Sequence, residues 1–126
     1  MFHLTVRDHV MIAHSLPHPL FGPAQNLHGA TYVVELTLWR ETLSSESIVI
    51  DIGEAAGVLS QALSDLNYRN LDEHSELAGT LTTTEAVARL IAERVATSLA
   101  NRDLTKLDVT LREHPDAWAG YTKTLD

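Results

Sequence analysis

Histidine and carboxylate side chains are the groups in this sequence that could do chemistry, because the chain contains no cysteine. Its 126 residues include seven histidines and 17 aspartates or glutamates. The lack of cysteine excludes disulfides, thiolate zinc ligands and thiol nucleophiles. Imidazoles can still bind a metal or transfer protons. The seven histidines make metal binding or acid–base chemistry worth testing, and Glu113 interrupts an apolar alternation just before Pro115.

Charge and hydropathy exclude two classes of partner. The formal net charge is -8 at pH 7, whereas nucleic-acid binding depends on clustered Lys and Arg. No apolar run approaches the roughly 18 residues that a membrane span needs. The first residues, MFHLTVRDH, lack the basic-then-apolar pattern of a signal peptide. We therefore expect a cytoplasmic protein that binds neither nucleic acid nor membrane.

The elements that must position these side chains follow from the spacing of apolar residues. Alternation predicts strands, and a 3.6-residue spacing predicts helices. The predicted order is strands at 2–15 and 30–40, helices at 52–66 and 82–101, and strands at 107–111 and 118–125. Asp51 is the expected N-cap of the first helix. His74 and Glu76 fall in a polar loop, 67–81, and are predicted to be solvated.

This order, ββααββ, predicts an α+β fold. We expect a four-stranded antiparallel sheet with both helices on one face, formed by a single domain over residues 1–126. The uncovered face would still carry Val33 and Trp39. Exposed apolar residues and open sheet edges are liabilities that association between copies removes. The sequence therefore predicts an oligomer.

Two local patterns resemble zinc-binding stretches of one enzyme family. Residues 12–16, IAHSL, resemble F-x-A-A-H-x-L, and residues 27–32, LHGATY, resemble L-H-G-H-x-Y. Both occur in the 6-pyruvoyl tetrahydropterin synthases and the similar 6-carboxytetrahydropterin synthases, which have the tunnelling fold (T-fold). The resemblance implies zinc positions at His14, His28 and residue 30, but residue 30 is Ala30. We expect the two histidines to be relics, with no zinc and no other cofactor.

The catalytic positions of the family are also changed. A cysteine is expected four residues before His28, and the residue there is Ala24. Residues 66–72, LNYRNLD, resemble L-D-H-x-x-L-N, with Asn67 and Tyr68 in place of the Asp-His pair. These side chains lack the acid–base groups on which the family reaction depends. We expect that the synthase reaction is not performed.

The ligand-anchoring stretches of the family are better preserved. Residues 82–86, TTTEA, resemble S/P-T-T/S-E-N, which implies Thr83, Thr84 and Glu85 near a pterin pocket. Residues 111–114, LREH, resemble the stretch whose glutamate anchors the pterin, which implies Glu113. One carboxylate can accept from two adjacent N–H groups of a pterin. An alternative for Thr82 and Glu85 is a helix capping box.

Three functions remain open from the sequence. The first is binding of a pterin- or purine-like molecule without the synthase reaction. The second is a metal-independent enzyme on a pterin-like substrate, with His14, His28 and Tyr68 as candidate groups. The third is a structural or regulatory subunit without a ligand. The resemblance also implies a homohexamer whose pockets lie at subunit interfaces.

Overall fold

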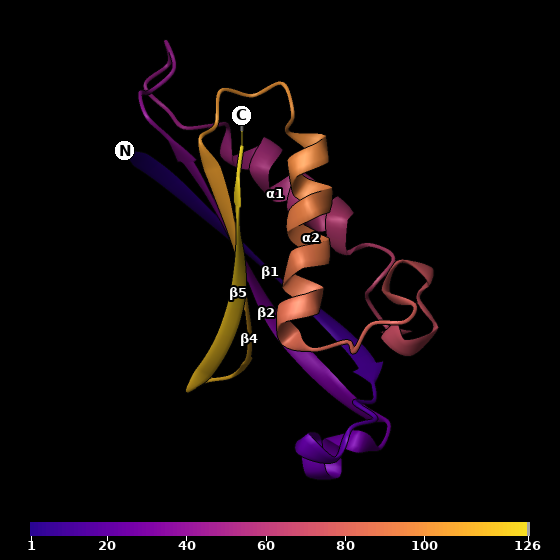
Figure 1. Cartoon of the computed structure of the whole chain (residues 1–126). Coiled ribbons are helices and arrows are strands. Elements are labelled where there is room, and N and C mark those ends of the chain that lie inside the picture. The colour runs from indigo at the N-terminus through magenta and orange to yellow at the C-terminus, as the bar shows by residue number, and fades with distance from the viewer. Residues whose placement is uncertain (126) are drawn as a thin grey trace.

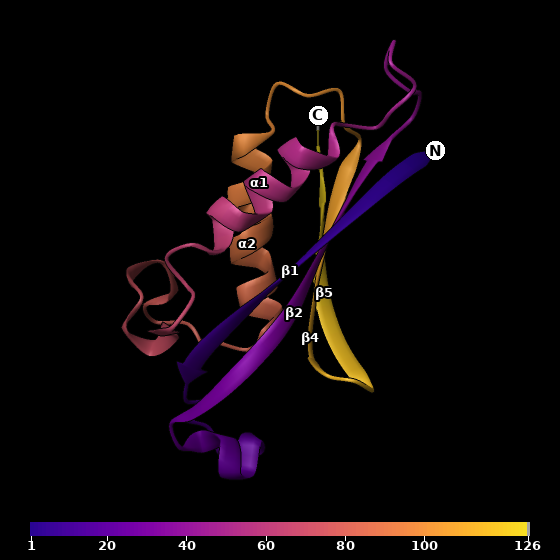
Figure 2. The ribbon, with the colours of Figure 1, turned by 180° about the vertical axis from the view of Figure 1, so that it is seen from behind.

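The computed structural model describes residues 1–125 as one five-stranded sheet with two α-helices against one of its faces (Figures 1 and 2). The strands are β1 (Phe2–His14), β2 (His28–Arg40), β3 (Arg69–Asn70), β4 (Lys106–His114) and β5 (Ala117–Thr124). The helices are α1 (Ile52–Leu63) and α2 (Thr84–Ser98), with short 3-10 helices at Pro19–Gln25, Leu71–Glu73 and Ser75–Leu77. No helix among these residues is both long and apolar enough to cross a membrane. The predicted α+β class is confirmed.

The strand order is β3-β1-β2-β4-β5, so the predicted count of four strands was wrong by one. Strand β3 lies inside the segment 67–81, which was predicted as a loop. It pairs in parallel with Ile12 and Ala13 of β1. The other pairings are antiparallel, as predicted. A two-residue strand is too short for an alternating pattern, which is why the sequence did not indicate it.

The long pairing of β1 with β2 fixes the faces of the sheet. It runs from Phe2 opposite Arg40 to His14 opposite His28. Even-numbered residues of both strands face the helices and form much of the core, including Val10, Ile12, Val34, Leu36 and Leu38. Because side chains alternate along a strand, this register places both predicted histidines on the helix side.

The two helices begin at hydroxyl or carboxylate caps. The Asp51 side chain accepts from the Glu54 N–H at 2.9 Å, which confirms the predicted cap of α1. Helix α2 is capped by Thr83, which accepts from the Ala86 N–H at 3.2 Å. The predicted capping box at Thr82 and Glu85 is therefore wrong, because the helix begins one residue later and Ala86 occupies its third position.

The open face of the sheet carries exposed apolar side chains at Met11 and Trp118, and a row of paired charges lies beside them. Glu35 accepts from Arg7 at 3.1 Å and from Arg112 at 2.9 Å across three strands. Burial acts to raise the pKa of Glu35, but these guanidinium groups outweigh it and lower that pKa. Trp39 is only partly exposed and donates to Asp108 at 2.7 Å.

Arg94 ties the 71–78 segment to the helices. Its guanidinium binds Glu76 at 2.9 Å and Asp65 at 3.1 Å, and it donates to the Ala62 carbonyl at 2.9 Å. The His74 ring contacts Asp65 at 3.1 Å, and only 12% of its side chain is exposed. The predicted solvation of His74 was wrong, because the sequence does not show that α2 brings a cation to this loop.

We expect this cluster to stabilise the fold in a pH-dependent way. Hydrogen bonds from Arg94 lower the pKa of Asp65 from 3.8 to about 2. A carboxyl with a lowered folded pKa contributes stability above its unfolded pKa and loses it as the pH falls through the folded value. The free energy of unfolding should therefore fall less between pH 4 and pH 2 in Asp65→Asn than in the wild type.

Chemical denaturation at several pH values measures this difference. Asp103→Asn is the matched control. Asp103 also pairs with an arginine, but it is 85% exposed and its contact with Arg40 is long, at 3.4 Å. Equal pH dependence in the wild type and Asp65→Asn would contradict the stabilising role of the cluster.

Candidate functional site

The predicted site residues meet where four elements come together. These are the end of β1, the start of β2, the start of α2 and the end of β4, at the lower end of the molecule in Figure 1. The rings of His14 and His28 lie side by side, with centroids 4.6 Å apart and planes inclined at 61°. The structure thus brings the two predicted histidines together.

His14 is held by the residues just before α2. It is 2% exposed, and its Nδ1 lies 2.8 Å from the Thr82 carbonyl oxygen and 3.1 Å from the Thr82 hydroxyl. The same hydroxyl donates to Asp72 at 3.3 Å, and Asp72 also accepts from the N–H and hydroxyl of Ser15. Thr82, predicted as a helix cap, instead joins β1 to the 71–73 helix.

These contacts place a hydrogen on Nδ1 of both rings. A carbonyl only accepts, so Nδ1–H of His14 is the donor to Thr82, and Nδ1–H of His28 donates to the Asn26 carbonyl at 2.8 Å. In the neutral form of either ring, the Nε2 atom then has a free lone pair. Burial lowers the pKa of His14 below 6.5, partly opposed by its hydrogen bond to Thr82. His14 is therefore a neutral imidazole at pH 7.

The site does not fit the zinc ion that the resemblance implies. Two Nε2 atoms are available, whereas catalytic zinc sites use three protein ligands. Ala30 lies on the same face of β2 as His28 and offers only a methyl group. Within residues 1–125, the one group of three potential ligands is Asp65, His74 and Glu76. The two carboxylates of this group, Asp65 and Glu76, are already paired with the Arg94 guanidinium.

The residues that the resemblance aligns with the remaining catalytic positions make structural contacts. Asn67 Oδ1 accepts from the Met11 N–H at 2.9 Å, and the Tyr68 N–H donates to the Met11 carbonyl at 2.6 Å. Tyr68 has a left-handed φ of 61°, and its side chain is 78% exposed. The Ala24 carbonyl accepts from the Leu16 N–H at 3.0 Å. These residues attach loops to β1 and its continuation.

The predicted anchor Glu113 lies beside the start of α2. The Thr84 hydroxyl donates to Glu113 Oε2 at 3.4 Å. Thr83 precedes Thr84 in the chain, and the Thr83 hydroxyl oxygen caps the helix. Glu85 is exposed in the first turn of α2. Of the four predicted ligand residues, Glu113 and Thr84 are therefore in direct contact.

Tyr32 is a site residue that the sequence reasoning missed. It is fully buried, and its hydroxyl has no hydrogen-bond partner within residues 1–125. Burial raises its pKa to about 12, the adjacent Thr84 hydroxyl opposes this, and the charges of Glu113 and Glu85 add to it. The β2–β4 register pairs Val33 with Arg112, so Tyr32 lies next to this pair on the side toward Glu113. The available signal was its place in LHGATY, on the same strand face as His28 and Ala30.

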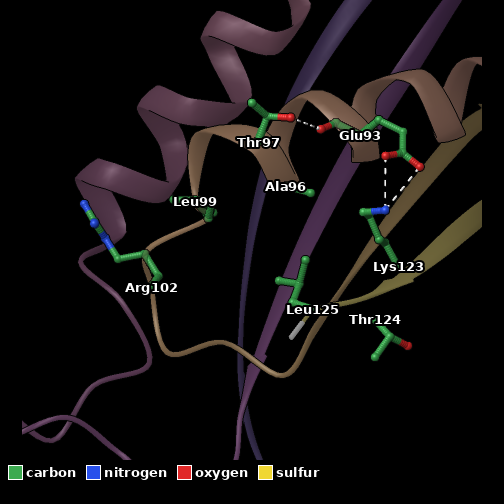
Figure 3. A pocket seen from close by; sticks show the side chains of 9 residues that line it. Glu93, Ala96, Thr97, Leu99, Arg102, Lys123, Thr124 and Leu125 are labelled. Carbon is green, nitrogen blue, oxygen red and sulfur yellow. Dashed lines mark hydrogen bonds and ion pairs between the residues drawn. The ribbon is translucent and has the colours of Figure 1, made fainter.

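A separate hollow lies between the C-terminal half of α2 and β5 (Figure 3). Its polar groups are already paired: Lys123 binds Glu93 at 3.1 Å, and the Thr97 hydroxyl donates to the Glu93 carbonyl at 3.1 Å. Arg102, at its rim, pairs with Glu54. This hollow contains none of the predicted site residues.

Comparison with known proteins agrees with this arrangement. The sequence profile of the family described as 6-pyruvoyl tetrahydropterin synthase matches residues 3–124. The chain belongs to this family. The match covers every element of the fold, from β1 to β5, and therefore all four elements that form the site. The predicted family is confirmed.

Individual relatives support the same assignment. The 6-carboxy-5,6,7,8-tetrahydropterin synthase of Bacillus subtilis (strain 168) is 27% identical over 95% of this chain and 84% of its own length. The 6-pyruvoyl tetrahydropterin synthase of Caenorhabditis elegans is 27% identical and superimposes with a TM-score of 0.83, covering 98% of this chain and 96% of that one. The Plasmodium vivax enzyme, at 17% identity, gives a TM-score of 0.80 with 98% of both chains covered and shows the fold alone. The predicted T-fold is confirmed.

We expect one substitution to restore a zinc site. The change Ala30→His would add a third imidazole on the face that carries His14 and His28, whose Nδ1–H groups are already hydrogen-bonded as in zinc sites. Metal analysis after dialysis against zinc should then find about one zinc per chain, against a small fraction in the wild type.

Ala13→His is the matched control, because Ala13 belongs to the same strand pair but points to the opposite face. Stoichiometric zinc in the wild type would show that a two-histidine site suffices and would contradict the fit described above.

Proposed function

We propose that this protein binds a pterin- or purine-like molecule at Glu113 and does not perform the synthase reaction of its family. The observation that carries the proposal is the contact of Glu113 with Thr84 at the start of α2. A pterin presents an N3–H and a 2-amino group side by side. One carboxylate can accept from both in a charge-assisted pair.

The surroundings of Glu113 support a ligand role over a purely structural one. Its contact with Thr84 is long, at 3.4 Å, and it has no ion pair with a cation among the described residues. A carboxylate whose oxygens are weakly used can exchange that contact for two short hydrogen bonds from a ligand.

The proposal excludes the family reaction because of the residues that replace its reactive groups. Ala24 has no ionisable side chain, and the Asn67 amide accepts a backbone hydrogen bond. Tyr68 points into solvent. The third zinc position is a methyl group. A bound pterin would meet neither a metal ion nor the proton-transfer pair of the family.

A metal-independent enzyme is the second candidate, and one observation favours it. His14 is neutral, and its Nε2 lone pair is free beside His28. A neutral imidazole of this kind can accept a proton from a bound substrate. Consumption of a pterin by the purified protein, rather than reversible binding, would favour this candidate. The cytoplasmic location stays a prediction.

The proposed assembly is a homohexamer formed through sheet edges. Strand β5 is one edge of the sheet, and β3 covers only Ile12 and Ala13 of β1, so much of β1 is a second edge. Unpaired edges of this length are normally covered.

We expect titration of the protein with biopterin and with sepiapterin to show saturable binding that depends on Glu113. The change Glu113→Gln should weaken binding at least tenfold, since a hydrogen bond to a charged group is worth about 1.5–3 kcal/mol. Intrinsic pterin fluorescence measures the affinity. The experiment uses protein shown by metal analysis to lack zinc.

Asp116→Asn is the control, because it removes a carboxylate from the turn that follows β4 and leaves the site unchanged. Wild-type protein that binds neither compound would leave a structural or regulatory subunit as the better explanation. Equal affinity of the wild type and Glu113→Gln would show that Glu113 is not the anchor.

The mass in solution should be six times that of the 13.9 kDa chain. Light scattering coupled to gel filtration measures it. A wild-type monomer at micromolar concentration would contradict the edge-pairing proposal.

A further inference from the structure

The β1 edge of the sheet presents backbone groups from its odd-numbered residues. The Met11 N–H bonds to Asn67, and the Met11 carbonyl accepts from the Tyr68 N–H, both on the side away from β2. Backbone groups of alternate residues point to the same side of a strand, so those of Arg7 and His9 also point away from β2. Strand β3 does not extend to them. These two residues can therefore receive another strand.

The β5 edge presents the matching groups from its even-numbered residues. The Leu125 N–H bonds to the Thr105 carbonyl at 2.8 Å, so odd-numbered residues of β5 direct their backbone groups to β4. Those of Thr122 and Thr124 then point outward. The pairings from β1 to β2, β4 and β5 are all antiparallel, so β1 and β5 run in opposite directions. A second copy in the same orientation can therefore extend the sheet.

We infer that β5 of a second copy pairs with the β1 edge in one register, which sets Asp8 opposite Lys123 of the second copy. The inference rests on the edge pairing proposed above. Backbone hydrogen bonds then form at Arg7 and His9 with the outward groups of β5. The ion pair between Asp8 and Lys123 selects the register.

Asp8 is a carboxylate that lacks a strong cationic partner within residues 1–125. It lies on the helix side of β1, and 35% of its side chain is exposed. It accepts from the His9 N–H at 2.8 Å and lies 3.9 Å from the His9 ring. An inward-pointing charge on an edge strand protects that edge from unspecific pairing. When a second strand takes the His9 N–H, the Asp8 carboxylate becomes free to bind a cation.

Lys123 carries that cation on the matching side of β5. It lies opposite the fully buried Leu107, so its side chain is also on the helix side. Figure 3 shows its ammonium group beside the Glu93 carboxylate, at 3.1 Å. An ammonium group has three donors, so Lys123 can bind Glu93 and Asp8 of another copy together. The two residues would form a non-hydrogen-bonded pair, in which facing side chains are closest.

The same register also fits the open face of the sheet. Met11 is 47% exposed on that face and would lie opposite Gly120 of the second copy. A Cβ added at Gly120 would meet the Val109 carbonyl oxygen at 2.6 Å, so this position requires glycine. The missing side chain leaves space for Met11.

Other registers lose both contacts. A shift by one residue would set the helix side of one copy against the open side of the next. A shift by two residues keeps the sides but sets Asp8 opposite Tyr121 or Leu125, and neither side chain carries a cation. Met11 would then meet a side chain instead of a glycine.

Introduced cysteines test the register directly, because the chain has none of its own. Asp8→Cys combined with Lys123→Cys should give disulfide-linked multimers under mild oxidation. Facing residues of such a pair have Cα atoms about 4.5 Å apart, and disulfides span roughly 4.4–6.8 Å. Within one chain β1 and β5 are three strand spacings apart, about 14 Å, so the bond must join two copies. Non-reducing gel electrophoresis measures the multimers.

Two matched controls represent the neighbouring registers. Asp8→Cys is combined with Tyr121→Cys in one and with Leu125→Cys in the other. Both should cross-link at least about tenfold more slowly, because a diagonal pair lies beyond the reach of a disulfide.

Charge reversal supplies the second arm of the experiment. Asp8→Lys sets two ammonium groups against each other, so the dissociation constant should rise about tenfold, equivalent to about 1.4 kcal/mol. Adding Lys123→Asp should restore most of the association, because the pair is then re-formed in reverse. Light scattering over a dilution series measures both. Asp103→Lys is the control for added charge, and melting temperatures check that each variant is folded.

The outcomes separate the register from the edge pairing on which it rests. A monomeric wild type overturns both. An oligomer in which a control pair cross-links faster than the pair at residues 8 and 123 overturns the register and leaves the edge pairing standing. An oligomer that none of the three pairs cross-links overturns the pairing of β1 with β5. Failure of Lys123→Asp to restore association of the folded Asp8→Lys variant overturns the ion pair.

Discussion

The hydrogen bond from the buried His14 ring to the Thr82 carbonyl joins the end of β1 to the residues that precede α2. Thr82 is further linked through its hydroxyl to Asp72, which in turn binds Ser15. These contacts place the first turn of α2 next to the start of β2 and the end of β4. Thr84 can contact Glu113 only because α2 begins at this point. The geometry of the candidate ligand site thus depends on a histidine that resembles a zinc ligand of the family.

The chain retains the positions of a family site while giving several of them different contacts. His14 and His28 keep the Nδ1–H bonds to backbone carbonyls that orient metal-binding imidazoles. The third histidine is absent, and the residues at the Asp-His positions attach a loop to β1. A site that loses metal ligands in this way can keep its shape, because the backbone contacts do not depend on the metal.

The open face of the sheet shows why a residue list can mislead about surfaces. Val33 and Trp39 suggested an apolar face, but the neighbouring strands bring Glu35, Arg7 and Arg112 into one paired row. Trp39 is covered in part by the Lys106 ammonium group, 4.7 Å from the ring centroid. Sequence alternation gives the composition of one strand at a time, whereas surface polarity depends on which strands are adjacent. The unpaired groups of this sheet are at its edges.

The amino-acid sequence by itself determined the fold class, the family, the cap at Asp51 and the grouping of His14, His28, Thr84 and Glu113. These depend on local periodicity and short ordered patterns, which are properties of contiguous residues. The tertiary structure decided the strand β3, the start of α2 at Thr84, the link from Thr82 to His14 and the unpaired hydroxyl of Tyr32. Each of these depends on contacts between segments distant in the sequence. Whether a buried polar atom has a partner is a matter of packing, and packing is set only when those segments meet.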